Sequence, residues 1–342
     1  MSEADHVLRA WSWEEVPVVR PLSVGLINQS YMLAGRSGPH AALQRLNTNV
    51  FVPEVNEDIE AVTRHVASKG LDTPLLRRTR YGRLWHQAED GSIWRVLSWV
   101  GDRTIERICS NEEAEGAGEL VARFHHATAD LKWEFRSVRG AFHDTNLRIE
   151  RLSGALETHR SHHLYGSVAT LAESIHGAWR AWEGPLDLPH RIVHGDLKIS
   201  NVRFLGQQAI ALIDLDTLGR GTLDAELGDA FRSWCNPSRE DGPARFDADL
   251  FAAGIRGYAS AARDVSDLEW DAIVPGIERI ALELAARFAT DALEESYFGF
   301  DSTRFATRGD HNLARARAQL QFAEEVRAAR RAAEELVRAV RV

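Results

Sequence analysis

The sequence is poor in cysteine, with two cysteines among 342 residues, and this scarcity excludes a disulfide framework. It has no apolar run long enough to cross a bilayer, because arginine, aspartate or glycine interrupts even the best stretches within a few residues. The N-terminus Met-Ser-Glu-Ala-Asp-His lacks the basic and apolar regions of a signal peptide. These absences predict a cytoplasmic protein that is not inserted into a membrane.

An excess of positive charge is also missing. The 41 lysines and arginines face 50 aspartates and glutamates, and the formal net charge of −9 argues against a surface that binds nucleic acid. None of the fourteen histidines shows metal-ligand spacing, because the paired ones are adjacent and point apart, so we expect no zinc site. The charge balance favours small-molecule substrates over nucleic acid, and we expect a monomer or a weak homodimer.

The most informative feature that is present is the run over residues 191–201, followed by an apolar, β-branched strand that ends at Asp214. Together they follow the order H-x-D-x-x-x-x-N … D, with Asp196 and Asn201 on one loop. Protein-kinase-like phosphotransferases use this arrangement. The motif therefore predicts phosphoryl transfer.

The chemistry of phosphoryl transfer explains why these residue types occur together. The phosphoryl group in transfer spreads negative charge over its oxygens, so the protein mainly supplies positioning, metal ions and a proton acceptor. We expect Asp196 to accept the proton of the attacking hydroxyl, and Asn201 and Asp214 to bind Mg²⁺ through hard oxygen ligands. Lys198 can reach the transferred phosphate. An ordinary turn would explain His194-Gly195-Asp196 alone, but not the ordered set that follows.

Hydrophobic periodicity predicts an α+β protein with two lobes. A small β-rich lobe over residues 1–100 is expected to bind the nucleotide, and a mainly helical lobe over residues 101–342 to carry the catalytic loop and the substrate site, with a hinge at Gly101-Asp102. The expected strands cover residues 16–22, 30–33, 41–46, 83–86 and 92–100, with a hairpin over 201–213. The expected helices cover residues 54–69, 111–129, 148–159, 167–182, 247–262, 271–294 and 311–341.

The motif over residues 194–201, with residues 213–217, resembles the aminoglycoside phosphotransferase and choline kinase superfamily, whose members share the bilobal protein-kinase-like fold. Further segments resemble its N-acetylhexosamine 1-kinase branch; these are residues 25–31, 43–51, 141–145 and 312–320. The resemblance spans nearly the whole chain. It implies ATP and Mg²⁺ as cosubstrates, and transfer to the anomeric hydroxyl of an N-acetylated hexosamine.

The sequence departs from the protein-kinase pattern in two places. The third strand reads Leu-Gln-Arg-Leu over residues 43–46 and has no lysine, so Arg45 either holds phosphate instead or points to solvent, because strand alternation leaves its face undecided. Residues 23–30 contain one glycine, so the G-x-G-x-x-G phosphate loop is absent. Asn28 and Ser30 then bind phosphate, or they form a polar turn.

Several acidic residues are candidates for supporting roles. Glu60, on the helix expected after the third strand, is a candidate partner of the strand cation or a member of a solvated helix face. Asp216 either touches a second metal ion or caps the segment that follows. His194 and Asp229 are expected to support the catalytic loop, with Asp229 buried so that it braces the loop.

Acceptor recognition is the step that the sequence defines least. Arg315, whose planar guanidinium suits an array of hydroxyls, is a candidate, as are His143 and Asp144; the alternative for Arg315 is a solvated helix face. A sugar is the leading acceptor, and an aminoglycoside, homoserine or choline is the alternative within the superfamily. A nucleotide-binding pseudokinase is the alternative of another class: the missing strand lysine favours it, and the intact catalytic motif opposes it.

Overall fold

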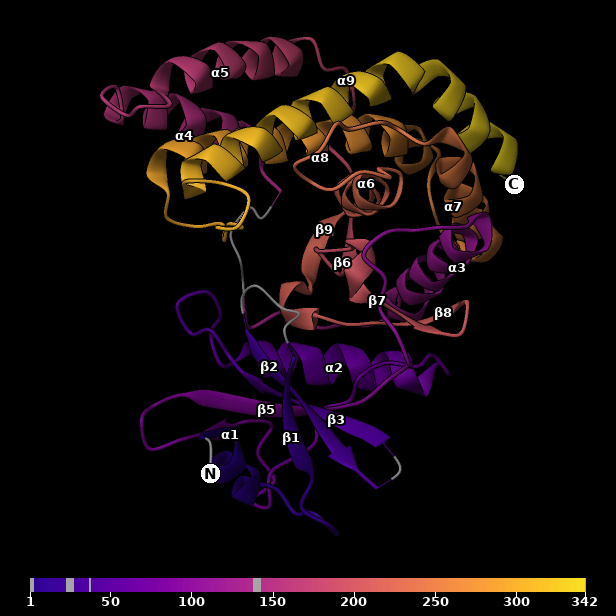
Figure 1. The fold of residues 1–342 in the computed structure, drawn as a ribbon. Coiled ribbons are helices and arrows are strands. Elements are labelled where there is room, and N and C mark those ends of the chain that lie inside the picture. The colour runs from indigo at the N-terminus through magenta and orange to yellow at the C-terminus, as the bar shows by residue number, and fades with distance from the viewer. Residues whose placement is uncertain (1–2, 23–27, 37, 138–142, 342) are drawn as a thin grey trace.

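The computed structural model describes the whole chain apart from residues 1–2, 23–27, 37, 138–142 and 342. Its N-terminal part is an antiparallel sheet in the order β1-β2-β3-β5-β4 (Figure 1). Of the expected nucleotide loop over residues 23–30, residues 23–27 lie outside the described residues, and residues 28–30 lead into β2. The strands are β1 Val18–Leu22, β2 Gln29–Gly35, β3 Gly38–Arg45, β4 His86–Gln87 and β5 Ile93–Ser98.

The two faces of this sheet have different neighbours, because successive side chains of a strand point to opposite faces. One face carries Leu43, Trp94 and Val96, which form a buried cluster with the N-terminal helix α1 (Glu3–Val7) and the 3₁₀ turn η1 (Leu8–Ala10). The other face is turned toward helix α2 (Val55–Ser68) and the rest of the molecule (Figure 1). This second face is the one that contributes to the candidate site.

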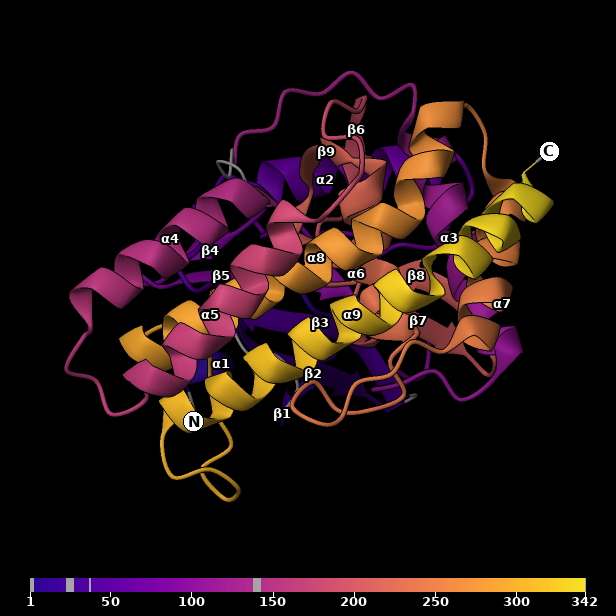
Figure 2. The same ribbon diagram turned by 90° about the horizontal axis from the view of Figure 1, so that it is seen from above.

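The remainder of the chain is mainly helical. Helix α9 packs along α8, and α4 and α5 lie beside this pair (Figure 2). Of the described helices none combines the length and the apolar character that crossing a membrane requires. The helices are α3 Asn111–Thr128, α4 Thr145–Thr158, α5 Tyr165–Arg180, α6 Leu223–Trp234, α7 Ala248–Ala261, α8 Asp267–Glu294 and α9 Arg308–Val340.

Two short strand pairs lie between the sheet and the helices (Figure 1). The hairpin expected over residues 201–213 is present as β7 (Val202–Leu205) and β8 (Gln208–Leu212). The pairing of β6 (His190–Val193) with β9 (Gly219–Thr222) was not expected from the sequence. Because β6 leads into the catalytic loop and β8 leads into the segment with Asp214, these strands position the candidate site.

Several element boundaries differ from the expected ones, and capping accounts for two of the differences. Helix α4 begins at Thr145 because the Asp144 carboxylate accepts a hydrogen bond from the Leu147 N–H. Helix α8 begins at Asp267 because Ser266 and Glu269 form a capping box. The strand expected over residues 83–86 was wrong, since only His86–Gln87 pairs with β5.

The chain passes from β5 to α3 alongside strand β7. Gly101 has a φ of +63°, and a Cβ atom there would lie 2.7 Å from the carbonyl oxygen of Phe204. The next residue, Asp102, donates its N–H to that same oxygen at 2.8 Å. Glycine is therefore required at this crossing, while a hinge motion at Gly101-Asp102 stays a prediction.

Candidate active site

The loop between β6 and β7 brings the catalytic candidates together. The Lys198 Nζ atom lies 2.8 Å from Asp196 Oδ2 and 3.9 Å from Asp214 Oδ2. The Asn201 amide donates hydrogen bonds to Asp196 Oδ2 at 3.0 Å and to the Asp196 carbonyl at 2.9 Å. Two carboxylates, an amine and an amide thus converge at one place, although Asp214 comes from a separate strand end.

The backbone of this loop is held tightly at its start. Gly195 has a φ of +80°, and a Cβ atom there would lie 2.6 Å from the carbonyl oxygen of Thr217. The ring of His194 forms a hydrogen bond from Nε2 to the carbonyl oxygen of Ile213 at 2.9 Å. His194 thus connects the loop of Asp196 to the residue before Asp214, in keeping with a supporting role.

A buried carboxylate, Glu226 on α6, braces the loop. Its two oxygens accept the N–H groups of His194 at 2.7 Å and Gly195 at 2.9 Å, and His125 Nε2 lies 3.4 Å from Oε1. Burial raises the pKa of Glu226, but the hydrogen bond and charge of His125, together with the Gly195 N–H, outweigh burial and lower it. Asp229, which was expected to brace the loop, is buried on the same helix and pairs with Arg232 at 2.8 Å, so its role in supporting the loop stays a prediction.

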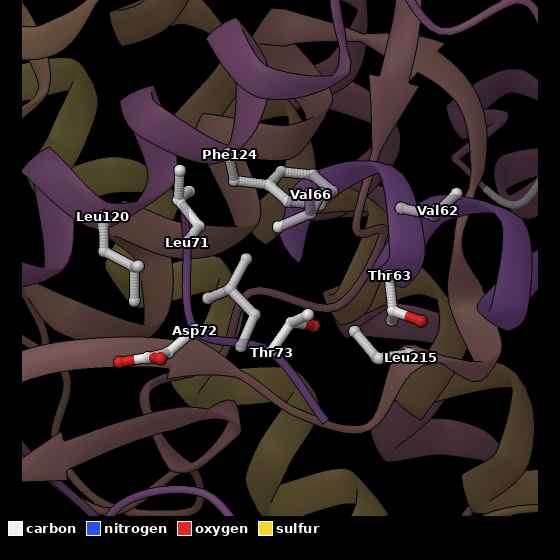
Figure 3. A pocket seen from close by; sticks show the side chains of 10 residues that line it. Val62, Thr63, Val66, Leu71, Asp72, Thr73, Leu120, Phe124 and Leu215 are labelled. Atoms are coloured by element: carbon white, nitrogen blue, oxygen red, sulfur yellow. The ribbon is translucent and has the colours of Figure 1, made fainter. Parts of the chain in front are cut away.

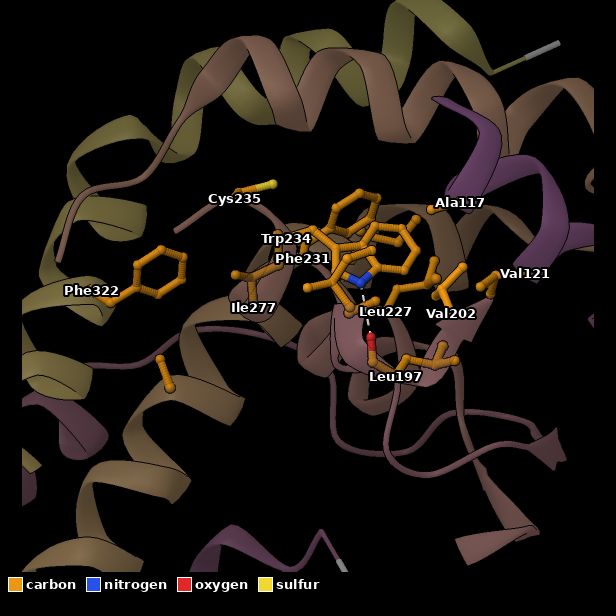
Figure 4. Close-up of a cluster of buried hydrophobic side chains, with 14 of the residues drawn as sticks. Ala117, Val121, Leu197, Val202, Leu227, Phe231, Trp234, Cys235, Ile277 and Phe322 are labelled. Carbon is orange, nitrogen blue, oxygen red and sulfur yellow. Dashed lines mark hydrogen bonds between the residues drawn. The ribbon is translucent and has the colours of Figure 1, made fainter. Parts of the chain in front are cut away.

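The floor beneath the catalytic loop is apolar. Trp234 and Phe231 on α6 are buried in a cluster with Leu197, and the Trp234 indole N–H donates to the Leu197 carbonyl at 2.9 Å (Figure 4). Ile199 donates its N–H to the Ser233 hydroxyl at 3.1 Å. Helix α6 therefore supports the loop along its length, through packing as well as through hydrogen bonds.

Asp214 occupies a conformation that non-glycine residues rarely adopt, with φ 63° and ψ 55°. The residue after it, Leu215, borders an apolar pocket between α2 and α3, with Val62, Val66 and Phe124 (Figure 3). Burial and the nearby Asp216 carboxylate raise the pKa of Asp214, although Lys198 acts in the opposite direction. A cation beside Asp214 would offset this unfavourable environment.

The donor atoms of the site fit a hard divalent cation. Because the Asn201 amide nitrogen donates to Asp196, the amide oxygen is the atom left to bind a metal. Within the described residues, no group of three or more His, Cys, Asp or Glu side chains could hold an ion. Mg²⁺ usually takes one or two protein carboxylates and completes its shell with phosphate and water. Asp214 and Asn201 supply such a partial set.

Lys198 is a cation in this arrangement. Burial lowers the pKa of its amine, but the carboxylates of Asp196, Asp214 and Asp229 raise it, and the net shift is upward. The amine therefore stays protonated at neutral pH and can attract phosphate oxygens.

The structure does not bring Arg45 to this site. Its side chain lies on the face of the sheet that carries α1, where it pairs with Glu3 at 3.4 Å and Asp90 at 3.3 Å. Arg45 shares this face with Leu43, two residues earlier, as strand alternation requires. Glu60 is not near Arg45 either, because its carboxylate pairs with Arg64 and Arg78. The expectation that Glu60 pairs with a strand cation was therefore wrong.

Arg95 on β5 is the strand cation that faces the site. Its guanidinium binds both oxygens of Asp216, at 2.6 and 2.7 Å, and each of the two side chains is 1% exposed. One alternative was that Asp216 caps the segment that follows. Its carboxylate instead binds Arg95. The Asn28 amide donates to Asp216 Oδ2 at 2.7 Å, and the Ser30 hydroxyl accepts from Gln44 at 3.1 Å. Both residues are engaged within the protein on the face of Arg95.

The candidate acceptor residues pack against helix α8. The His143 ring lies 3.1 Å from Glu283 Oε1, and the Thr145 hydroxyl donates to Glu283 Oε2 at 3.1 Å. Burial lowers the pKa of His143, but Glu283 and Asp229 raise it, and the net shift is upward. Asp144 uses its carboxylate as the cap of α4, which accounts for its position without a ligand.

Arg315 on α9 is packed rather than solvated, with 13% of its side chain exposed. It donates to the Gly299 carbonyl at 2.7 Å and to Asn312 Oδ1 at 3.1 Å, and it pairs with Glu240 at 3.3 Å. Asn312 in turn donates to Asp291 Oδ2 on α8 at 2.8 Å. The two segments that contain His143 and Arg315 therefore both attach to α8.

Comparison with known proteins gives consistent matches. Residues 18–263 match the profile of the family described as "Phosphotransferase enzyme family". The chain is 26% identical over 308 residues to homoserine kinase of Methylocella silvestris, and the match covers 86% of each protein. It is 27% identical over 261 residues to homoserine kinase of Brucella anthropi, covering 74% of this chain and 72% of that protein.

The fold is similar to solved kinase structures. A microcompartment-associated aminopropanol kinase matches with a TM-score of 0.64 at 15% identity, over 95% of this chain and 97% of that one. An amicoumacin kinase, solved with AMP-PNP and Ca²⁺, matches with a TM-score of 0.62 at 15% identity, over 93% of this chain and 91% of that one. These likenesses confirm the predicted α+β, protein-kinase-like fold.

Proposed function

The chain belongs to the phosphotransferase enzyme family, and on that premise we propose that it transfers the γ-phosphoryl group of ATP to a hydroxyl of a small molecule with the help of Mg²⁺. The observation that carries the proposal is the convergence of Asp196, Lys198 and Asn201 with Asp214. This set supplies a proton acceptor, a phosphate-binding cation and two oxygen ligands for a metal ion.

Each of these side chains has a role that its surroundings support. Asp196, with 28% of its side chain exposed, accepts the proton of the acceptor hydroxyl while that oxygen bonds to the γ-phosphorus. The bond from this phosphorus to the β,γ-bridging oxygen breaks, and ADP leaves. Lys198 attracts the phosphate oxygens, and Asn201 and Asp214 hold Mg²⁺. A bound Mg²⁺ would offset the negative charge of the phosphates.

Substitution of the proton acceptor tests the proposal. Asp196→Asn changes one oxygen to nitrogen at nearly constant size, so we expect the fold and nucleotide binding to persist while turnover falls at least about 10²-fold. Calorimetric titration of ATP with and without Mg²⁺ tests the metal ligands in parallel, and Asp214→Ala should remove the tightening that Mg²⁺ gives. An Asp196→Asn enzyme with more than half the wild-type rate would exclude the assignment.

The acceptor that we favour is an N-acetylhexosamine, phosphorylated at the anomeric hydroxyl. The support is the resemblance of residues 141–145 and 312–320 to the hexosamine 1-kinase segments, together with the attachment of both segments to α8 through Glu283 and Asp291. The anomeric hydroxyl is more acidic than the other sugar hydroxyls, so it requires a weaker base.

Homoserine is the second candidate acceptor. It is favoured by the curated relatives, which are named homoserine kinases and match at 26% and 27% identity. An amino acid carries one carboxylate and one ammonium group. Asp229 and Arg232 have the complementary charges, but they pair with each other at 2.8 Å and are 8% and 11% exposed, so they could bind homoserine only by giving up this pair.

A screen of acceptors for ADP release separates these possibilities. GlcNAc, GalNAc, homoserine, aminopropanol, choline and an aminoglycoside form a suitable panel. Phosphorus coupling at the anomeric proton of the sugar product supports the hexosamine 1-kinase proposal, whereas phosphate on the 6-hydroxyl or turnover of homoserine alone replaces it. Nucleotide binding without turnover of any acceptor would favour a pseudokinase.

A further inference from the structure

We infer that Arg95 is a positioning residue for the metal site: it anchors Asp216 and thereby fixes Asp214, two residues earlier. This inference rests on the proposed function, since it assigns Asp214 to the metal ion. It differs from the expectation that a strand cation holds phosphate directly.

The hydrogen bonds of Arg95 show why it acts through another residue. Its five N–H groups make five hydrogen bonds: two to Asp216, two to Gln44 and one, at 3.4 Å, to Asn56. A guanidinium has five donors in a fixed planar fork. Arg95 could therefore bind a phosphate only by giving up a present partner, and at 1% exposure it is buried away from solvent.

The partners of Arg95 come from separate elements that surround the site. Gln44 lies directly across from Arg95 in the register of β3 and β5, Asn56 lies on α2, and Asp216 lies in the 3₁₀ turn η3 (Leu215–Thr217). Asn28, in the expected nucleotide loop, binds the same Asp216 oxygen as Arg95. The buried Asp216 carboxylate thus binds Arg95 from strand β5 and Asn28, the residue before strand β2.

Asp214 is connected to this cluster through a short and constrained backbone. Its positive φ of 63° is a conformation that persists only when neighbouring contacts impose it. On the following residues, Leu215 is buried in the main apolar core beside the pocket between α2 and α3, and Asp216 is fixed by Arg95 (Figure 3). Two adjacent anchors therefore determine where the Asp214 carboxylate lies, and only the second depends on charge.

The buried ion pair is better explained by positioning than by stability. Removing two charges from water costs about as much as their attraction returns, so replacing such a pair with apolar residues is often neutral or stabilising. A bidentate contact between guanidinium and carboxylate does, however, fix the orientation of the two side chains relative to each other. Apolar side chains of similar volume can fill the same space without fixing the turn.

The test compares the metal dependence of nucleotide binding in two variants. The affinity for ATP is measured by calorimetry with and without Mg²⁺ in wild type, Arg95→Met and the double variant Arg95→Met/Asp216→Leu. Residues that orient metal ligands typically contribute about 10- to 100-fold to metal affinity. In wild type, Mg²⁺ should increase the affinity for ATP. We expect this increase to be smaller by about 10- to 100-fold in both variants, while the affinity for ATP without metal changes little.

The double variant separates positioning from stability. Arg95→Met leaves Asp216 buried without its partner and should unfold more easily, whereas the double variant removes both charges and should have a higher midpoint of thermal unfolding than Arg95→Met. If the double variant recovers both the midpoint and the Mg²⁺ dependence, Arg95 has only a structural role and the inference is overturned.

Arg45→Met is the matched control, because it removes an arginine of the same sheet whose partners lie on the other face. It should keep the wild-type Mg²⁺ dependence, and loss of that dependence in Arg45→Met but not in Arg95→Met would overturn the inference. If wild type binds no nucleotide under any condition, the proposed function fails; if wild type tightens with Mg²⁺ and the Arg95 variants do so equally, only the inference fails.

Discussion

The brace beneath the catalytic loop offers a sharp test of how the fold supports the chemistry. We predict that Glu226→Gln lowers both stability and turnover. Glu226 is 1% exposed, and each of its oxygens accepts a backbone N–H, from His194 at 2.7 Å and from Gly195 at 2.9 Å. Glutamine has one amide nitrogen in place of an oxygen, so one of these N–H groups would face another donor.

The expected magnitude follows from the lost contact. A hydrogen bond to a charged group contributes about 1.5–3 kcal/mol, and a buried donor without a partner costs about 1–3 kcal/mol. We therefore expect the free energy of unfolding to fall by about 3 kcal/mol, a large part of the roughly 5–15 kcal/mol of a typical domain. The loop would relieve the clash by shifting, and a shift of about 1 Å at a reacting group can cost about 10²-fold in rate.

The assay pairs urea unfolding with steady-state kinetics, and Glu113→Gln is the matched control. Glu113 is also buried and accepts one backbone N–H, from Cys109 at 2.9 Å, and one arginine N–H, from Arg103 at 2.8 Å. It lies on α3, apart from the catalytic loop. Glu113→Gln should lose comparable stability and keep kcat/KM. Equal losses of kcat/KM in the two variants, or none in Glu226→Gln, would refute the role of the brace.

The convergence of the candidate catalytic residues could be predicted from the sequence because they are close together along the chain. Asp196, Lys198 and Asn201 share one loop, and Asp214 follows a single hairpin, so the geometry depends on local turns. Strands and helices with a clear hydrophobic period were predicted for the same reason. The sequence also contains a signal for the helix cap at Asp144, because aspartate is a preferred N-cap residue. We instead interpreted Asp144 as a candidate for binding the acceptor.

Arg95 and Glu226 escaped prediction because their partners are distant in sequence. Arg95 and Asp216 are 121 residues apart, so the contact depends on the assembled fold. One signal was present: Arg95 lies in the middle of the apolar strand β5, where a charged residue is rarely buried unless it is paired. The signal indicates a buried partner but does not identify it. Likewise Asp224, Glu226 and Asp229 are three acidic residues on one helix, and only tertiary packing selects Glu226.

The face of Arg45 was undecidable for a related physical reason. Gln44 and Arg45 are both polar, so alternation alone does not tell which of them is turned toward the site. The decision depends on Leu43 and Trp94, which are buried under α1. That helix has five residues, too few to be stable by itself, so local propensity could not reveal it.

Two further predictions concern the backbone of the loop and the acceptor side. Gly195→Ala should abolish activity and destabilise the protein, because its φ of +80° disfavours a side chain and the new Cβ would lie 2.6 Å from the Thr217 carbonyl oxygen; wild-type kinetics and an unchanged unfolding midpoint would contradict this. Glu283→Gln should change the pH dependence of stability, because the pKa of His143 is raised in the fold and that of Glu283 is lowered, with burial opposing the charge pair in both cases. Glu283 contributes to the free energy of unfolding above its unfolded pKa of about 4.3. The contribution of His143 is complete below its unfolded pKa of about 6.5, and it is lost as the pH rises through the raised folded pKa. The difference in unfolding free energy between wild type and Glu283→Gln, measured in urea, should therefore be largest near about pH 5.5 and shrink toward about pH 9. A difference that stays constant over this range would mean that His143 and Glu283 form a neutral hydrogen bond instead of an ion pair.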